Sequence, residues 1–163
     1  MNGVANLALK QSSAMGEISF IDLKAQQRRI RENVERRLAN VLDHGRYIAG
    51  PEIDEFEALL AEKTGAAAAV SCASGTAALV IGLLANGLDA GDAVFLPAFT
   101  YNATANAVLL TGATPVFVDI DPHTFNIDPA DLERRIDRVK QEGRLRPRAI
   151  VPVDLFGSPA DYR

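Results

Sequence analysis

The chain has 163 residues, a formal net charge of −4, and 48% hydrophobic against 23% charged residues. This is the composition of an ordinary globular chain, which excludes a fibrous or largely disordered protein, and the negative charge disfavours binding to nucleic acid or to an anionic membrane surface. The single cysteine, Cys72, can form neither an intrachain disulfide nor a zinc cluster, so a reducing, cytoplasmic compartment is predicted.

The chain begins with a segment that lacks any regular pattern and continues with two predicted helices. We expect residues 1–17 to be a disordered tail. Apolar residues recur at helical spacing within 22–44, which predicts one amphipathic helix that Gly45 ends. A turn leads to a second predicted helix over 51–63, with a proline at its first position, where a missing N–H costs nothing.

The rest of the chain alternates short apolar runs with helical patterns. The apolar runs are typical of strands buried on both faces and lie at 66–72, 93–96, 116–118 and 149–153. Helical patterns stand between them at 75–86, 101–110 and 128–142. This alternation predicts an α/β fold, a parallel sheet flanked by helices. Such sheets bind ligands beyond the carboxyl ends of their strands, so the four loops that follow the strands are the candidate sites.

The loop after the first predicted strand joins that strand to a helix through small residues. Ser74, Gly75 and Thr76 stand at the helix start, where free backbone N–H groups favour an anion such as a phosphate. The alternative is that Ser74 only caps the helix. The chain has neither a G-x-G-x-x-G nor a G-K-[ST] motif, so neither common nucleotide-binding fingerprint is present.

Aromatic residues distinguish the second loop. Phe99 and Tyr101 follow a predicted buried strand directly, so at least one of the two rings is expected over the strand ends, where it could stack on a flat ligand. We expect Phe99 to belong to the core and Tyr101 to face a ligand.

The remaining polar residues favour structural roles. Asp119 and Asp121 are typical of a turn, although two carboxylates could also bind a cation or a ribose. Asp154 is either a site residue or a turn cap, and the residues leave this open. Cys72 is expected to be a buried, inert thiol. His44 and His123 stand far from other ligand-type residues, so no metal site is predicted.

Six blocks of residues, taken together, resemble a known family. In chain order they are FIDL at 20–23, YIAGPE at 47–52, SGTAAL at 74–79, FTYNAT at 99–104, FVDID at 117–121 and LFG at 155–157. The chain resembles the N-terminal part of the DegT/DnrJ/StrS family of sugar aminotransferases, which depend on pyridoxal 5'-phosphate (PLP) and have the fold type I architecture. Within the family it is most similar to enzymes that aminate a UDP-2-acetamido-2-deoxy-3-oxo-hexuronate.

The resemblance implies roles for five residues. Gly75 and Thr76 would hold the cofactor phosphate, with Ser74 beside them, and Tyr101 would stack on the pyridine ring, with Thr104 also at the cofactor. It further implies that glutamate donates the amino group to a nucleotide-linked keto sugar, and that the protein works as a cytoplasmic homodimer.

Two departures from the family pattern qualify this implication. In the family the Schiff-base lysine lies downstream of the LFG block, beyond Arg163, so residues 18–163 are interpreted as a truncated part of the domain with no catalytic residue of its own. Asp154 stands where many relatives carry histidine. Two alternatives are a deoxysugar dehydratase of the same family, in which histidine replaces the lysine, and a non-catalytic module that binds a phosphorylated ligand.

Overall fold

The computed structural model describes residues 20–162. The chain divides after Ala69 into two compact units. The predicted tail at 1–17 lies outside the described residues. None of the helices described in 20–162 is long and apolar enough to cross a membrane.

The first unit contains the two predicted helices, α2 (Leu23–His44) and α3 (Pro51–Thr64), both confirmed. The Asp22 carboxylate caps α2 by accepting the N–H of Ala25 at 2.9 Å. The sharp turn between the helices requires Gly50, because a Cβ there would stand 2.5 Å from the carbonyl oxygen of Arg46.

Two polar contacts join α2 to α3 in this unit. Arg37 makes a two-pronged ion pair with Glu55, with N–O distances of 2.6 and 2.7 Å, and this hydrogen bond lowers the pKa of Glu55. His44 Nε2 lies 3.1 Å from the Glu52 carboxylate. Neither helix buries a residue within the described part of the chain, so apolar side chains such as Phe56 stay exposed.

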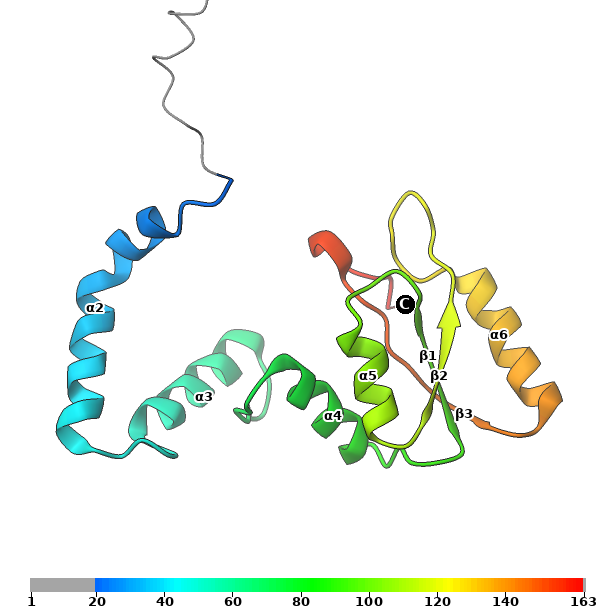
Figure 1. Ribbon diagram of the computed structural model, residues 1–163, viewed down its shortest axis with the longest axis horizontal. Coiled ribbons are helices and arrows are strands. Elements are labelled where there is room, and N and C mark those ends of the chain that lie inside the picture. Colours follow the sequence, from blue (N-terminus) through cyan, green and yellow to red (C-terminus); the bar gives the residue numbers. More distant parts are fainter. Residues whose placement is uncertain (1–19, 163) are drawn as a thin grey trace, which may run out of the picture. The chain divides into compact units, whose positions relative to one another are not determined.

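The second unit is a layered α/β structure around a parallel sheet, as predicted (Figure 1). Its elements are α4 (Gly75–Ala85), β1 (Asp92–Pro97), α5 (Ala103–Leu110), β2 (Thr114–Val118), α6 (Pro129–Glu142), β3 (Arg146–Ile150) and the 3-10 turn η2 (Leu155–Gly157). The described sheet has the strand order β2-β1-β3, with both pairs parallel.

The central strand β1 forms the core of this unit, because all of its residues are buried. Its side chains alternate between two apolar clusters. Val94 and Leu96 pack with Val108 of α5, whereas Ala93 and Phe95 pack with Val139 of α6. The period of two in a strand therefore places one helical layer on each face of the sheet, with α5 and α6 on opposite sides of the strands in Figure 1.

The predicted strand at 66–72 is wrong. This segment forms no strand, most of it is exposed, and Val70 is 84% exposed. An apolar run becomes a strand only when another strand pairs with its backbone, and none of the described strands does so here. For the same reason Cys72 is exposed rather than buried, and its thiol donates to the carbonyl oxygen of Ser74 at 3.4 Å.

The last strand begins earlier than the predicted 149–153. Arg146 opens β3, donating its N–H to Gly91 at 2.8 Å, and its guanidinium pairs with Asp89 and Asp92, each at 3.0 Å. Alternate residues of β3 are exposed, so its charged beginning lacks the apolar signal on which the prediction relied.

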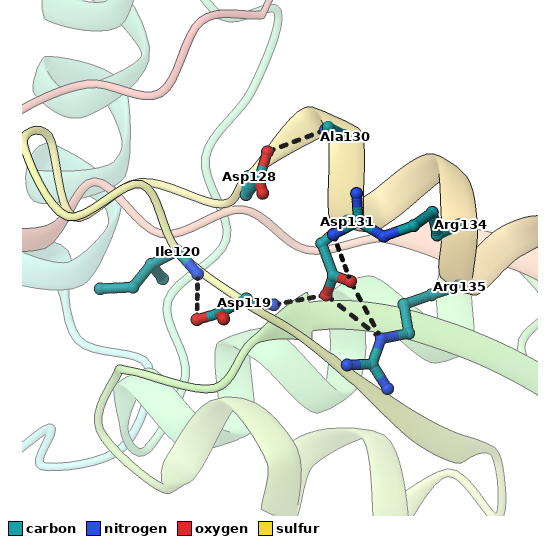
Figure 2. Close-up of polar contacts among 7 residues, drawn as sticks. All are labelled: Asp119, Ile120, Asp128, Ala130, Asp131, Arg134 and Arg135. Atoms are coloured by element: carbon teal, nitrogen blue, oxygen red, sulfur yellow. Dashed lines mark hydrogen bonds and ion pairs between the residues drawn. The ribbon is translucent and has the colours of Figure 1, made fainter.

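A buried carboxylate connects α6 to the end of β2 (Figure 2). The side chain of Asp131 is 8% exposed and accepts the N–H of Asp119 at 2.8 Å. Arg134 and Arg135 donate to the same carboxylate at 3.0 and 3.1 Å. The hydrogen bond from Asp119, together with those from the two arginines, lowers the pKa of Asp131.

Replacement of this carboxylate is expected to destabilise the second unit. Asp131→Ala leaves the Asp119 N–H without its acceptor and should lower the free energy of unfolding by about 1–3 kcal/mol, as measured by urea denaturation. Asp137→Ala is the matched control on the same helix. The side chain of Asp137 is 60% exposed, and its ion pair with Lys140 is long, with an Nζ–Oδ1 distance of 3.9 Å. Equal losses in both variants would contradict this role for Asp131.

The same carboxylate should make stability depend on pH. Because folding lowers the pKa of Asp131, its contribution is present above the unfolded pKa of about 3.9 and is lost as the pH falls through the folded value. Asp131→Asn should therefore lose less stability than the native chain between pH 7 and about pH 2. Urea midpoints measured at several pH values test this, and parallel pH profiles would refute it.

Candidate functional site

The start of α4 offers backbone N–H groups with no partner inside the helix. Ser74 has extended backbone angles, and its hydroxyl accepts the N–H of Ala77 at 3.1 Å, so Ser74 caps the helix as the alternative interpretation expects. Ala78 donates to the carbonyl oxygen of Ser74 at 2.9 Å and begins the helical hydrogen bonds. The N–H groups of Gly75 and Thr76 precede the first helical hydrogen bond and have no acceptor within the helix, so they are available to an anion.

Gly75 is a glycine that the fold itself does not need. A Cβ added there would meet nothing within 4 Å, and its φ is not in the left-handed region. Gly82 in the same helix has equally open surroundings, so open space alone does not distinguish Gly75. What distinguishes Gly75 is its place at the helix start, beside N–H groups that have no helical partner. With no side chain at this position, a ligand can approach the backbone closely.

The second loop places a free aromatic ring beyond the carboxyl end of β1. Tyr101 is 77% exposed, in agreement with the expectation that it does not belong to the core. Thr104 is 8% exposed and lies within the first turn of α5. Helices α4 and α5 are in contact, so the loops before them belong to one packed pair. Ser74, Gly75 and Thr76 make no described hydrogen bond to Tyr101 or Thr104.

The third and fourth loops are held by their own carboxylates. Asp121 accepts the N–H groups of His123 and Thr124 at 2.7 and 3.0 Å, which confirms the turn and lowers the pKa of Asp121. Asp154 accepts the N–H of Ala160 and the hydroxyl of Tyr162, both at 2.9 Å. The Asp154 side chain makes no capping hydrogen bond to η2, the turn that follows it, and instead holds the segment at 160–162.

Sequence reasoning missed a group of three aromatic rings, which we name the phenylalanine cluster: Phe99, Phe125 and Phe156. The ring centroids are 6.0 Å apart for Phe99 and Phe125, 6.4 Å for Phe99 and Phe156, and 5.4 Å for Phe125 and Phe156. Phe99 is half-exposed and packs here, not in the predicted core. The sequence does show one phenylalanine in each of three loops that follow strands. Only the fold shows that the three rings are in contact.

A hollow of about 610 Å³ lies elsewhere in the second unit, between the later part of α4 and β3. Gly82, Asn86 and Ile150 are among its lining residues, and none of the five predicted cofactor residues is. Within residues 20–162, no group of three His, Cys, Asp or Glu side chains could hold a metal ion. The candidate site is therefore the open surface at the start of α4 and the loop that carries Tyr101.

Comparisons with known proteins agree with this fold. UDP-2-acetamido-2-deoxy-3-oxo-D-glucuronate aminotransferase from Pseudomonas aeruginosa is 50% identical over 145 residues, 89% of this chain and 38% of that relative. The crystal structure of a DegT DnrJ EryC1 StrS aminotransferase from Brucella abortus matches with a TM-score of 0.86 at 48% identity, covering 90% of this chain and 39% of that one.

A third relative carries a cofactor. NtdA from Bacillus subtilis, solved with bound cofactor PMP, matches with a TM-score of 0.74 at 36% identity, covering 90% of this chain and 33% of that one. The chain thus spans only 33–39% of the length of these relatives. A family model matches residues 28–163. On this match and these relatives, the chain belongs to the DegT/DnrJ/EryC1/StrS aminotransferase family.

Proposed function

We propose that the chain is part of a PLP-dependent enzyme that transfers an amino group from glutamate to a nucleotide-linked keto sugar. The observation that carries the proposal is the start of α4, where the N–H groups of Gly75 and Thr76 come before the first helical hydrogen bond and no side chain covers Gly75. The relative from Pseudomonas aeruginosa is named for a UDP-linked 3-oxo sugar acid, and NtdA holds PMP, which supports both the substrate class and the cofactor.

The residues present fit the phosphate of this cofactor. The N–H groups of Gly75 and Thr76 are free to donate to phosphate oxygens, and the partial positive charge at the helix start attracts them. The absence of a side chain at Gly75 lets the phosphate reach the backbone. Ser74 holds the first turn in place through its hydrogen bond to the N–H of Ala77.

Tyr101 and Thr104 complete the proposed binding surface. The exposed phenol ring of Tyr101 would stack on the pyridine ring and fix its plane, while Thr104 belongs to the first turn of the helix that follows. When bound, the cofactor supplies the electron sink and carries the amino group between donor and acceptor. The described residues would bind and orient it.

We also propose that the protein is a homodimer, as the resemblance implies. The helix α4 is apolar around its whole circumference, yet it buries no residue among those described. Ile81 and Leu84 on this helix are 53% and 52% exposed. A helix with apolar residues on all sides is expected to be covered. A second copy of the chain, or the remainder of a longer protein, would provide that cover.

Substitution of Gly75 should separate binding from folding. In the complete gene product, Gly75→Ala places a Cβ where the phosphate would approach, so pyridoxamine 5'-phosphate should bind about tenfold more weakly in a fluorescence titration. Thermal stability should be equal to that of the native protein or slightly higher, because alanine favours helix.

Gly82→Ala is the matched control, since Gly82 also lies in α4 and a Cβ there also meets nothing within 4 Å. It should leave the dissociation constant unchanged. If Gly75→Ala binds pyridoxamine 5'-phosphate as the native protein does, or if both variants weaken binding equally, the proposed phosphate site is wrong.

Amino transfer itself can be measured with defined substrates. The complete gene product, given PLP, glutamate and a UDP-linked 2-acetamido-2-deoxy-3-oxo-glucuronate, should produce 2-oxoglutarate and an amino sugar detectable by mass spectrometry. Tyr101→Ala should lower kcat/KM by about tenfold, whereas Tyr101→Phe, which keeps the ring, should retain most of it. No 2-oxoglutarate from the native protein would reject the proposed reaction.

A further inference from the structure

The phenylalanine cluster joins the loops that follow all three strands of the described sheet. Phe99 comes from the loop after β1, Phe125 from the loop after β2, and Phe156 from η2 after β3. The three centroid distances lie between 5.4 and 6.4 Å, within the range in which aromatic pairs attract each other. The rings of Phe125 and Phe156 meet almost at right angles, with an interplanar angle of 87°.

The backbone is strained at two members of this cluster. Phe125 has a φ of 61° and Phe156 a φ of 57°, both in the left-handed region that residues with a Cβ rarely adopt. Surrounding contacts hold these conformations. The N–H of Phe125 donates to the carbonyl oxygen of Asp121 at 2.8 Å. The side-chain amide of Asn126 donates to the carbonyl oxygen of Pro159 at 3.0 Å, which ties the loop after β2 to the segment after β3.

The loop that carries Tyr101 has few other anchors. Ala98 donates its N–H to Val118 at 2.8 Å, and Thr104 donates to the carbonyl oxygen of Tyr101 at 3.2 Å. Between these two backbone hydrogen bonds, the ring of Phe99 provides the described side-chain contact, while the ring of Tyr101 points into solvent. The direction of the Tyr101 ring therefore depends on how firmly Phe99 holds the loop.

We propose that the phenylalanine cluster is a positioning device for Tyr101: Phe125 and Phe156 hold the ring of Phe99, and Phe99 fixes the loop that orients the tyrosine. The three phenylalanines need not touch the cofactor. Their effect on cofactor binding rests on the proposed function, because it passes through Tyr101. Their effect on the orientation and motion of Tyr101 does not depend on the proposed function, because it needs no cofactor.

The first measurement follows Tyr101 without any ligand. The complete gene product is labelled with 3-fluorotyrosine, and a Tyr101→Phe variant assigns the ¹⁹F resonance of Tyr101. Phe156→Ala removes two of the three ring contacts and should shift or broaden that resonance. Phe156→Tyr keeps a ring at the same position and should leave the Tyr101 resonance as in the native protein, next to the additional resonance of the new tyrosine.

The second measurement is the dissociation constant for pyridoxamine 5'-phosphate. Phe156→Ala should weaken binding about fivefold, and Phe156→Tyr should bind as the native protein does. Phe117→Ala is the matched control, because Phe117 lies outside the cluster on β2 and is exposed, as Phe156 is (50% and 75%). It should change neither the Tyr101 resonance nor the dissociation constant.

The outcomes separate this inference from the proposed function. A Tyr101 resonance that is unchanged in Phe156→Ala, or changed equally in Phe117→Ala, overturns the positioning role. So does a fall in Tm with the resonance unchanged, because the cluster would then serve stability alone. A native protein that does not bind pyridoxamine 5'-phosphate overturns the proposed function, while the ¹⁹F spectra still decide whether the cluster orients Tyr101.

Discussion

Burial of β1 on both faces is the constraint on which the second unit depends. The strand is apolar along its centre, and its alternating side chains need cover on two sides, so α5 packs against one face and α6 against the other. Parallel pairing with β2 and β3 then brings the ends of all three strands to one edge. The loops with Tyr101, Asp121 and Asp154 share that edge for this reason.

The candidate site and the scaffold use opposite physical features. The scaffold relies on buried groups: apolar side chains around β1, and the Asp131 carboxylate that accepts the N–H of Asp119. The proposed cofactor surface instead relies on two exposed residues, Gly75 and Tyr101, with the half-buried Thr76 and the buried Thr104 beside them. Gly75 and Tyr101 contribute little to the core, so the fold does not depend on them. Substitutions at these two residues should therefore change ligand binding without unfolding the protein.

Errors of sequence reasoning here share one cause. The segment 66–72 has the apolar composition of a buried strand but no described strand pairs with it, and Cys72 is exposed as a result. Conversely, β3 begins with arginines that looked like surface sequence, yet its backbone pairs with β1. The composition of a segment indicates whether its side chains can be buried. A strand forms only where a second backbone pairs with it through hydrogen bonds.

The sequence by itself determined the features that depend on near neighbours. The helix starts at Ser74 and Asp128 follow from caps that accept N–H groups three and two residues away, and the alternation of runs predicted the α/β class. Tertiary structure alone decided the hydrogen bond from Asp119 to Asp131 and the phenylalanine cluster. Those contacts join residues separated by up to 57 positions between Phe99 and Phe156, and no local pattern encodes such a distance.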